Sequence, residues 1–271
     1  MSSEQAIINE AGSAARFSRK SVDIDGIGLR YREAGAGAPL VCLHGGGGLR
    51  LSRAHGILAE HHRVIALAIP GFGETPADPR LATLADFATL LNRAVAALGL
   101  ERYSLMGHGL GAGLALAMAL ARPDPVDAIV LIAPVAIRPT RPAGGKVGSD
   151  MLYVHPERHG AAEPLPASVA ALQAETASLL FRAFEDEAFE AGLKALQVPV
   201  LSLFGTVDRV TPTDLARLYR TALPSSYIAM VYDAAHAIDA ERPEAVASIA
   251  ADFLARRERF IVSSDIGLIN P

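Results

Sequence analysis

The sequence predicts an α/β fold: a mostly parallel, doubly wound sheet flanked by helices, with a small helical cap insertion. Short apolar runs of strand length alternate with helical patterns through most of the 271 residues, and several runs stop at glycine-rich segments. With 51% hydrophobic and 20% charged residues, the chain belongs neither to the disordered class nor to the small disulfide-stapled scaffolds. We expect a single domain over residues 1–271.

The sheet is expected to begin with a hairpin. The segments SVDI and LRYREAG are joined by Asp25-Gly26, a dipeptide that tolerates the positive φ of a tight turn. Two apolar runs that stop at glycine-rich loops then predict buried strands: 40–43 before HGGGG (44–48), and 64–69 before PGFG (70–73).

An amphipathic helix is predicted next, because apolar residues recur at steps of three and four and Gly99 follows as a C-terminal glycine. These residues are Leu84, Phe87, Leu91, Val95 and Leu98. The run 103–106 then leads into GHGLG (107–111) and a helix of small residues that ends before Pro123.

The alternation of strands and helices continues to the end of the chain. Further strands are predicted at 128–133, 200–204 and 227–232, and a last helix at 243–257. Thr211, Pro212 and Asp214 suit the N-cap and the first and third positions of another helix.

Residues 138–197 interrupt this pattern with a Pro/Gly-rich stretch and two helical segments. The apolar residues of these segments are Val169, Leu172, Leu179 and Leu180, then Phe189, Leu193 and Leu196. We interpret this stretch as a helical cap inserted between two sheet strands, which shapes a pocket and excludes water. The first fifteen residues and the tail after Arg257 are expected to be poorly ordered or to pack on a partner chain.

Composition limits the possible partners. A formal net charge of −4 without a basic stripe argues against nucleic acid. The single cysteine, Cys42, cannot form an internal disulfide, and no apolar run reaches the roughly 18 residues that span a bilayer. We therefore expect a cytoplasmic protein without a membrane partner, and the amphipathic cap leaves room for a homodimer.

The segment GHGLG lies between a predicted strand and a predicted helix, the context in which a tight bend presents a nucleophile above a sheet. A dinucleotide-binding loop is the alternative for such a glycine string. That alternative requires the glycines after the first strand and an acidic residue about twenty positions later. Here the loop comes late and the stretch around Ile129 and Val130 is apolar, so we reject it.

The order of motifs resembles the α/β-hydrolase superfamily from about Ser21 to Arg257. The motifs are His44-Gly45, PGFGET, GHGLG, GTVDRVTP and AAHAIDAERP. This resemblance implies an α/β-hydrolase fold, a catalytic acid at Asp208 and a catalytic histidine at His236. It also implies an oxyanion hole formed by the backbone N–H groups of Gly46 and Leu110.

The position of the nucleophile is vacant, because Gly109 stands where the family has Ser, or less often Cys or Asp. Loss of such a nucleophile costs on the order of 10⁶ in rate. Ser104 lies inside the preceding strand and cannot replace it. Gly45 and His108 are candidates for substrate contact, although the side chain of His108 is expected to point away from the pocket. A second departure is Ala68, where the family commonly has an aspartate.

Other residues have simpler explanations. Asp214 is a rival for the acid, but a helix cap explains it better. His61, His62, His155 and His159 do not form a complete ligand set, so we expect no metal, and Cys42 in a core strand is expected to be an inert thiol. No nucleotide or flavin cofactor is implied.

Three functions remain open. The first is a hydrolase of an ester, thioester, lactone or activated C–C bond in a small hydrophobic carbonyl substrate, inactivated or made to trap substrate by Gly109. The second is an enzyme of lyase, cyclase or another cofactor-free type, in which His236 and Asp208 act on a water or a substrate proton without a covalent nucleophile. The third is a non-catalytic protein that binds a ligand in the same pocket.

Overall fold

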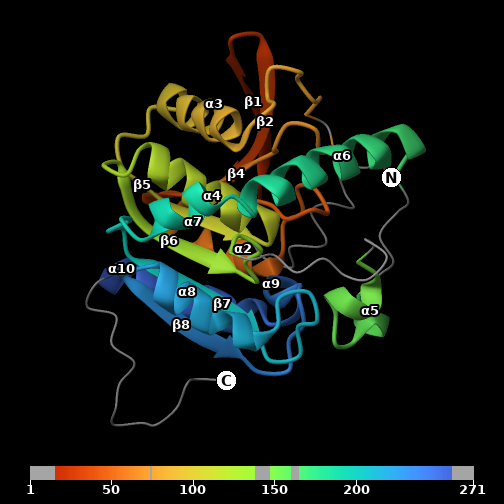
Figure 1. The fold of residues 1–271 in the computed structure, drawn as a ribbon, viewed down its shortest axis with the longest axis vertical. Helices are drawn as coiled ribbons and strands as arrows, with labels where there is room; N and C mark the ends of the chain where they lie inside the picture. The colour runs from red at the N-terminus through yellow and green to blue at the C-terminus, as the bar shows by residue number, and fades with distance from the viewer. Residues whose placement is uncertain (1–15, 74, 138–146, 160–164, 258–271) are drawn as a thin grey trace.

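The computed structural model describes residues 16–73, 75–137, 147–159 and 165–257. Its centre is an eight-stranded sheet in the order β1-β2-β4-β3-β5-β6-β7-β8 (Figure 1). The pairings β1–β2 and β2–β4 are antiparallel, and all later pairings are parallel. The strands are β1 Ser18–Ile24, β2 Ile27–Ala34, β3 Ala38–Leu43, β4 His62–Leu67, β5 Tyr103–His108, β6 Val126–Ile132, β7 Val200–Gly205 and β8 Ser226–Val231.

Helices cover both faces of the sheet, as the predicted doubly wound arrangement requires. Successive residues of β3 divide between two cores, because side chains alternate across a strand. Val41 and Leu43 pack with α3, α4 and α8, while Leu40 and Cys42 pack with α2 and α10. These helices are α2 Arg53–Leu58, α3 Leu84–Ala97, α4 Leu110–Ala121, α8 Ala216–Ala222 and α10 Pro243–Arg256.

The first predicted elements are confirmed. Asp25 and Gly26 have φ values of 54° and 80°, which form the tight turn between β1 and β2. Helix α3 begins after Thr83, whose side chain accepts a hydrogen bond from the amide of Asp86, and Gly99 follows its end with φ 73°.

The segment between β6 and β7 contains α5 Ser149–Leu152, the 3₁₀ turn η1 Pro156–Arg158, α6 Ala167–Phe184 and α7 Glu187–Leu193. Helices α6 and α7 both pack against α4, and Figure 1 shows α6 extending beyond it. Parts of the predicted insertion, 138–146 and 160–164, lie outside the described residues, as do both terminal segments. The assignment of this insertion as a cap stays a prediction.

The predicted apolar face of α6 was wrong in part. Its buried residues are Gln173, Thr176, Leu180 and Phe184, whereas Val169, Leu172 and Leu179 are only partly buried. The N-terminal half of this face lies against glycine-rich loops and not against the hydrophobic core. Polar side chains therefore occupy positions where the sequence pattern predicted apolar ones.

The predicted helix start at Thr211 was also wrong. Pro212 precedes a 3₁₀ turn, η2 Thr213–Leu215, and α8 begins only at Ala216. The hydroxyl of Thr211 donates instead to the carbonyl of Ala133, 3.3 Å away. A contact with a distant loop has replaced the expected cap.

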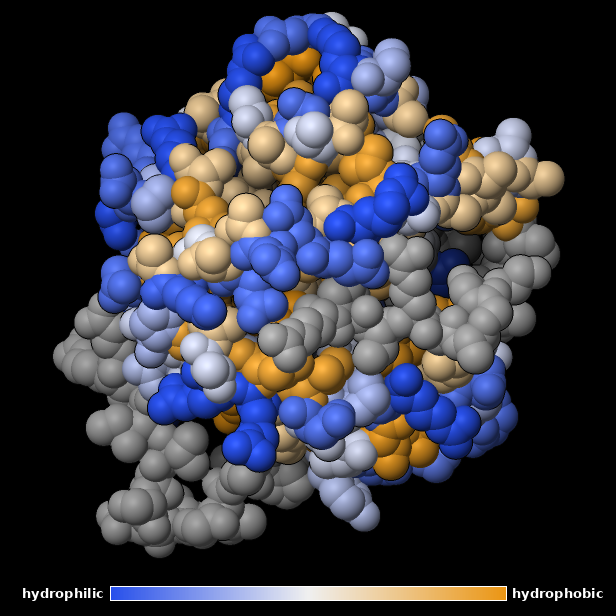
Figure 2. Space-filling model, in the orientation of Figure 1, coloured by the Kyte–Doolittle hydropathy of each residue, from blue (hydrophilic) through white to orange (hydrophobic). Residues whose placement is uncertain are grey.

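On the face shown in Figure 2, apolar surface residues are interspersed with hydrophilic ones. Among the described residues, no helix combines the length and apolarity needed to cross a bilayer.

Candidate active site

The bend at residue 109 joins β5 directly to α4. Gly109 has φ 52° and ψ −112°, in the region that favours glycine. The glycines on either side let the strand and helix approach closely, as predicted. A Cβ built on Gly107 would lie 2.4 Å from the carbonyl oxygen of Gly111, and one on Gly111 would lie 2.4 Å from that of Leu43.

The structure brings His236 and Asp208 together beside this bend. His236 lies in the loop between β8 and the short helix α9 Ile238–Glu241, and Asp208 follows β7. The Nδ1 atom of His236 lies 3.0 Å from Oδ2 of Asp208. Oδ1 of Asp208 accepts the amides of Val210 at 2.7 Å and Thr211 at 2.9 Å, so both carboxylate oxygens are bonded.

The surroundings of Asp208 keep it ionised. Burial of its fully enclosed side chain by itself raises the pKa of the carboxyl group. The hydrogen bond and charge of His236 and the two backbone N–H bonds outweigh burial, so the pKa of Asp208 is lowered. An ionised Asp208 accepts a hydrogen bond from the N–H at Nδ1 of His236. In this tautomer, Nε2 of His236 keeps its lone pair.

That lone pair faces the vacant position at Gly109. A Cβ built on Gly109 would lie 3.2 Å from Nε2 of His236 and 3.8 Å from Cα of Gly45. Within the described part of the chain, Nε2 of His236 has no hydrogen-bond partner. Among the described residues, this nitrogen is therefore left to accept a hydrogen bond from a group placed above the bend.

The loop 44–48 lies beside the same bend and is held from below by His44. Nδ1 of His44 lies 2.8 Å from the carbonyl of Gly45, and Nε2 accepts the amide of Ile69 at 3.0 Å. Burial lowers the pKa of His44 to about 4, which keeps the ring neutral. The amide of Gly48 donates to the carbonyl of Gly45 and closes the turn that carries Gly46.

The predicted oxyanion donors lie on this loop and on α4. Gly46 is exposed, and Leu110 is the first residue of α4, where N–H groups have no partner inside the helix. Among the described residues, the amide of Gly46 makes no hydrogen bond. Their role as an oxyanion hole stays a prediction.

His108 is held by the protein itself. Its Nε2 lies 2.9 Å from the carbonyl of His236, and a Cβ on Gly45 would lie 2.8 Å from its Nδ1. Burial lowers the pKa of this half-buried histidine, although the nearby carboxylate of Asp239 opposes the shift. His108 and Gly45 thus contact each other, and their contact with a substrate stays a prediction.

The remaining candidates lie elsewhere. Asp214 is exposed on η2, and Cys42 is buried in β3, where burial raises the pKa of its thiol. Among the described residues, no three His, Cys, Asp or Glu side chains are grouped as a metal ion requires.

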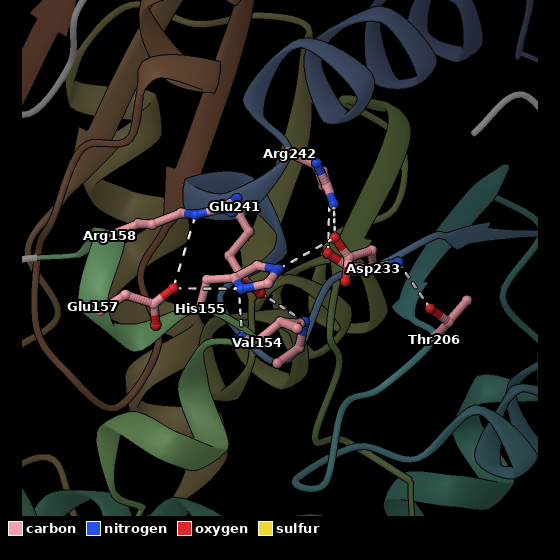
Figure 3. Close-up of polar contacts among 9 residues, drawn as sticks. Val154, His155, Glu157, Arg158, Thr206, Asp233, Glu241 and Arg242 are labelled. Carbon is pink, nitrogen blue, oxygen red and sulfur yellow. Dashed lines mark hydrogen bonds and ion pairs between the residues drawn. The ribbon is translucent and has the colours of Figure 1, made fainter.

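One functional candidate was missed from the sequence: Glu241 holds the loop of His236 against the insertion (Figure 3). Its Oε2 accepts the amide of Ala235 at 2.7 Å, and its Oε1 accepts that of Val154 at 2.6 Å. The amide of Ala237 donates to the carbonyl of Leu152 at 2.9 Å. Both neighbours of His236 are therefore tied, directly or through Glu241, to residues 152–154.

A second polar cluster extends this contact. The ring of His155 lies between the carboxylates of Glu157 and Asp233, at 3.5 Å from each. Asp233 also pairs with Arg242, and its amide donates to Oγ1 of Thr206 at 3.0 Å (Figure 3). In the sequence, His155 is considered only as a metal ligand, and this cluster is not predicted, because Asp233 and Thr206 meet His155 and Arg242 only in the fold.

Comparison with known proteins agrees with the fold. Residues 38–147 match the alpha/beta hydrolase fold family. A proposed carbamate hydrolase, RutD, from Klebsiella pneumoniae subsp. pneumoniae is 30% identical over 71% of this chain and 82% of its own length. The 2-hydroxy-6-oxo-6-(2'-aminophenyl)hexa-2,4-dienoic acid hydrolase of Metapseudomonas resinovorans is 26% identical over 90% of this chain and 93% of its own length.

Among solved structures, the meta-cleavage product hydrolase CumD from Pseudomonas fluorescens IP01 is similar, with a TM-score of 0.69. It is 20% identical, with coverage of 87% of this chain and 97% of that one, and so shows likeness of fold alone. Sequence order, sheet topology and these relatives agree: the chain belongs to the α/β-hydrolase family.

Proposed function

We propose that this protein is a hydrolase of small carbonyl substrates in which His236, oriented by Asp208, activates a water molecule above Gly109. One observation carries the proposal: Nδ1 of His236 is 3.0 Å from Asp208, while its unpartnered Nε2 faces the position where Gly109 has no side chain. The scissile bond is an ester, thioester, lactone, carbamate or activated C–C bond. The carbamate and C–C hydrolases among the relatives support this range.

The reaction follows from the position of the groups. Nε2 of His236 takes a proton from the water as the water oxygen forms a bond to the carbonyl carbon. The carbonyl π electrons move to oxygen, and the resulting oxyanion accepts the N–H groups of Gly46 and Leu110. When the tetrahedral intermediate collapses, the bond to the leaving group breaks and Nε2–H returns its proton to that group.

Each group supplies a distinct part of the rate. A positioned general base contributes about 10² to 10⁴, and each oxyanion donor about 10² to 10³. Asp208 fixes the tautomer of His236 and stabilises the imidazolium that forms during the reaction. This route needs no covalent intermediate. The absence of a side-chain nucleophile at residue 109 is therefore compatible with hydrolysis.

A second candidate is a serine hydrolase that has lost its nucleophile because Gly109 replaces the serine. One observation favours it: a Cβ built on Gly109 points toward Nε2 of His236, and the His–Asp pair is in place, so a shift of the ring by a few tenths of an ångström would admit a side-chain nucleophile. The two candidates differ in whether an acyl-enzyme forms.

The test uses 4-nitrophenyl acetate and butanoate, their thioester counterparts, γ-butyrolactone, a phenyl carbamate and a vinylogous 1,5-diketone. We expect the unmodified chain to hydrolyse at least one class without a burst, and intact-protein mass spectrometry to find no acyl adduct. His236→Gln should lower kcat by about 10² to 10⁴, whereas the exposed His61→Gln should leave it unchanged. A chain that is inert toward every class, or a His236→Gln variant with full activity, contradicts the proposal.

A further inference from the structure

The buried face of α6 changes character along its length. Leu180 and Phe184 fill its C-terminal half, and Phe184 packs so closely on α4 that a Cβ on Gly113 would lie 2.2 Å from its ring. One turn earlier the same face carries Gln173 and Thr176, which are only 7% and 8% exposed. Apolar residues are the rule on a buried helix face, so these two polar side chains require an explanation.

Each of the two side chains lies against a glycine-rich loop, Gln173 against the loop 44–48 of the site and Thr176 against PGFG (70–73). Nε2 of Gln173 is 3.3 Å from the position of a Cβ on Gly48, and Oγ1 of Thr176 is 2.2 Å from that of a Cβ on Gly71. Gly48 closes the turn that carries Gly46, through its hydrogen bond to Gly45. The carboxamide of Gln173 therefore approaches the loop that supplies one of the proposed oxyanion donors.

Neither side chain makes a hydrogen bond to another part of the described chain. Buried amides and hydroxyls in native proteins almost always have partners, because an unmet donor or acceptor forfeits the hydrogen bonds that water provided. The carboxamide of Gln173 is also not among the fully enclosed orphan atoms of the described core, which are the hydroxyls of Ser202 and Ser226. It thus remains within reach of a small molecule.

The side chains of Gln173 and Thr176 indicate which kind of ligand group could supply the missing hydrogen bonds. An amide and a hydroxyl carry no charge with which to balance a buried ion, and an unpaired ion is far more costly to bury than a neutral polar group. Gln173 offers both two N–H donors and a carbonyl acceptor. An uncharged group with its own donor and acceptor, such as a carboxamide or a carbamoyl group, satisfies both.

We propose that Gln173 is a specificity-determining residue that hydrogen-bonds an uncharged carboxamide or carbamoyl group on the substrate, away from the reacting carbonyl. Thr176 lies one turn further along α6, against Gly71. This inference rests on the proposed function for the place of the reacting carbonyl, but the binding that it describes does not require turnover.

The experiment measures binding of methyl ketones, which present a carbonyl but cannot be hydrolysed. Three lengths are used: 4-oxopentanamide, 5-oxohexanamide and 6-oxoheptanamide. Each is compared with the ketone that carries an isopropyl group in place of the carboxamide, and with the matching carboxylate. Dissociation constants come from NMR titration of the full-length chain.

For at least one length, we expect the carboxamide to bind about tenfold to a hundredfold more tightly than the isopropyl ketone. Gln173→Leu and Gln173→Met should abolish this preference, whereas Ser178→Ala on the same helix should retain it. Ser178 is a fair control because, among the described residues, its hydroxyl accepts a hydrogen bond from the exposed Arg182 alone. The Tm of Gln173→Leu should be equal to or above that of the unmodified chain, because Gln173 makes no hydrogen bond to the described residues that the substitution could remove.

Equal affinity for the carboxamide and isopropyl ketones, a preference for the carboxylates, no binding at any length, or an unchanged preference in both Gln173 variants overturns the inference. Failure of the proposed function is distinguishable. A chain that hydrolyses nothing but still prefers carboxamide ketones supports the recognition by Gln173 and contradicts the water mechanism alone.

Discussion

At residue 109 the proposed water mechanism and a covalent mechanism differ by one side chain. With φ at 52°, the backbone already has the conformation that presents a side chain to His236, and a glycine adopts it without a steric penalty. A Cβ at this position lies 3.2 Å from Nε2 of His236, which is tighter than an ordinary contact. The ring has therefore settled close to a position that a serine would occupy, and it must move by a few tenths of an ångström to admit one.

Gly109→Ser should convert the site to covalent chemistry. We expect the free energy of unfolding to fall by about 1–2 kcal/mol, since a non-glycine residue is strained at positive φ. The new hydroxyl next to Nε2 should react with a fluorophosphonate probe, which mass spectrometry detects as a single adduct.

Gly109→Ala is the matched control, because it adds the same backbone strain without a nucleophile. It should show the same loss of stability and no adduct. Labelling of the unmodified chain at this site, or a serine variant that stays unlabelled while folded, would count against the geometry described for His236.

At the scale of elements, the insertion and the His236 loop form one unit. Glu241 accepts the amides of Ala235 and Val154, and the amide of Ala237 donates to Leu152. Four peptide groups from two distant segments are thus joined on either side of His236 in the sequence. Since a displacement of about 1 Å can cost a hundredfold in rate, we expect Glu241 to act as a positioning residue for His236.

Glu241→Gln should loosen this connection without removing its bulk. The carboxamide oxygen of the variant can accept the N–H of either Ala235 or Val154. Its NH₂ group, which is a donor, then faces the other N–H and cannot bond it. We expect faster hydrogen exchange at the amides of Val154 and Ala235, and a decrease of about tenfold in kcat with little change in KM.

Glu157→Gln serves as the comparison for Glu241. The side chain of Glu157 is 68% exposed, and its ion pairs within the described residues are with His155 and Arg158, so the exchange rates and kcat of this variant should match those of the unmodified chain. If exchange at Val154 and Ala235 is equally slow in Glu241→Gln, the bridge does not hold the loop.

The elements show which features the sequence could predict. The strands, α3 and the meeting of Asp208 with His236 followed from local periodicity and from the order of motifs, because the carboxyl ends of parallel strands share one edge. The role of Thr211, the polar face of α6 and the bridge by Glu241 did not. Each depends on which group lies opposite in space, and the bond from Val154 to Glu241 spans 87 positions of the chain.

At the scale of the whole molecule, the loops after β3, β4, β5, β7 and β8 converge on one edge of the sheet. His44 joins two of them, because it bonds Gly45 in its own loop and the amide of Ile69 beyond β4. Only a neutral ring can do both, since its Nε2 must accept. Protonation of His44 therefore opposes folding of the edge on which the site is built.

His44 should consequently make the protein sensitive to acid between pH 6.5 and about pH 4. Burial lowers its pKa to about 4 in the folded chain from 6.5, so below pH 6.5 the unfolded chain binds a proton that the folded chain does not. The stability that His44 contributes is complete above pH 6.5 and is lost as the pH falls to about 4, a total of about 3 kcal/mol. Asp208, whose pKa is lowered from 3.8, loses its contribution only at a pH below this range.

Urea unfolding between pH 7.5 and pH 4 measures this effect. The difference in unfolding free energy between the unmodified chain and His44→Gln should shrink by about 3 kcal/mol as the pH falls. The corresponding difference for the exposed His61→Gln should stay constant. A His44→Gln difference that does not change with pH would mean that His44 is protonated as easily in the folded chain as in the unfolded one, and the neutral link between Gly45 and Ile69 would then have to be abandoned.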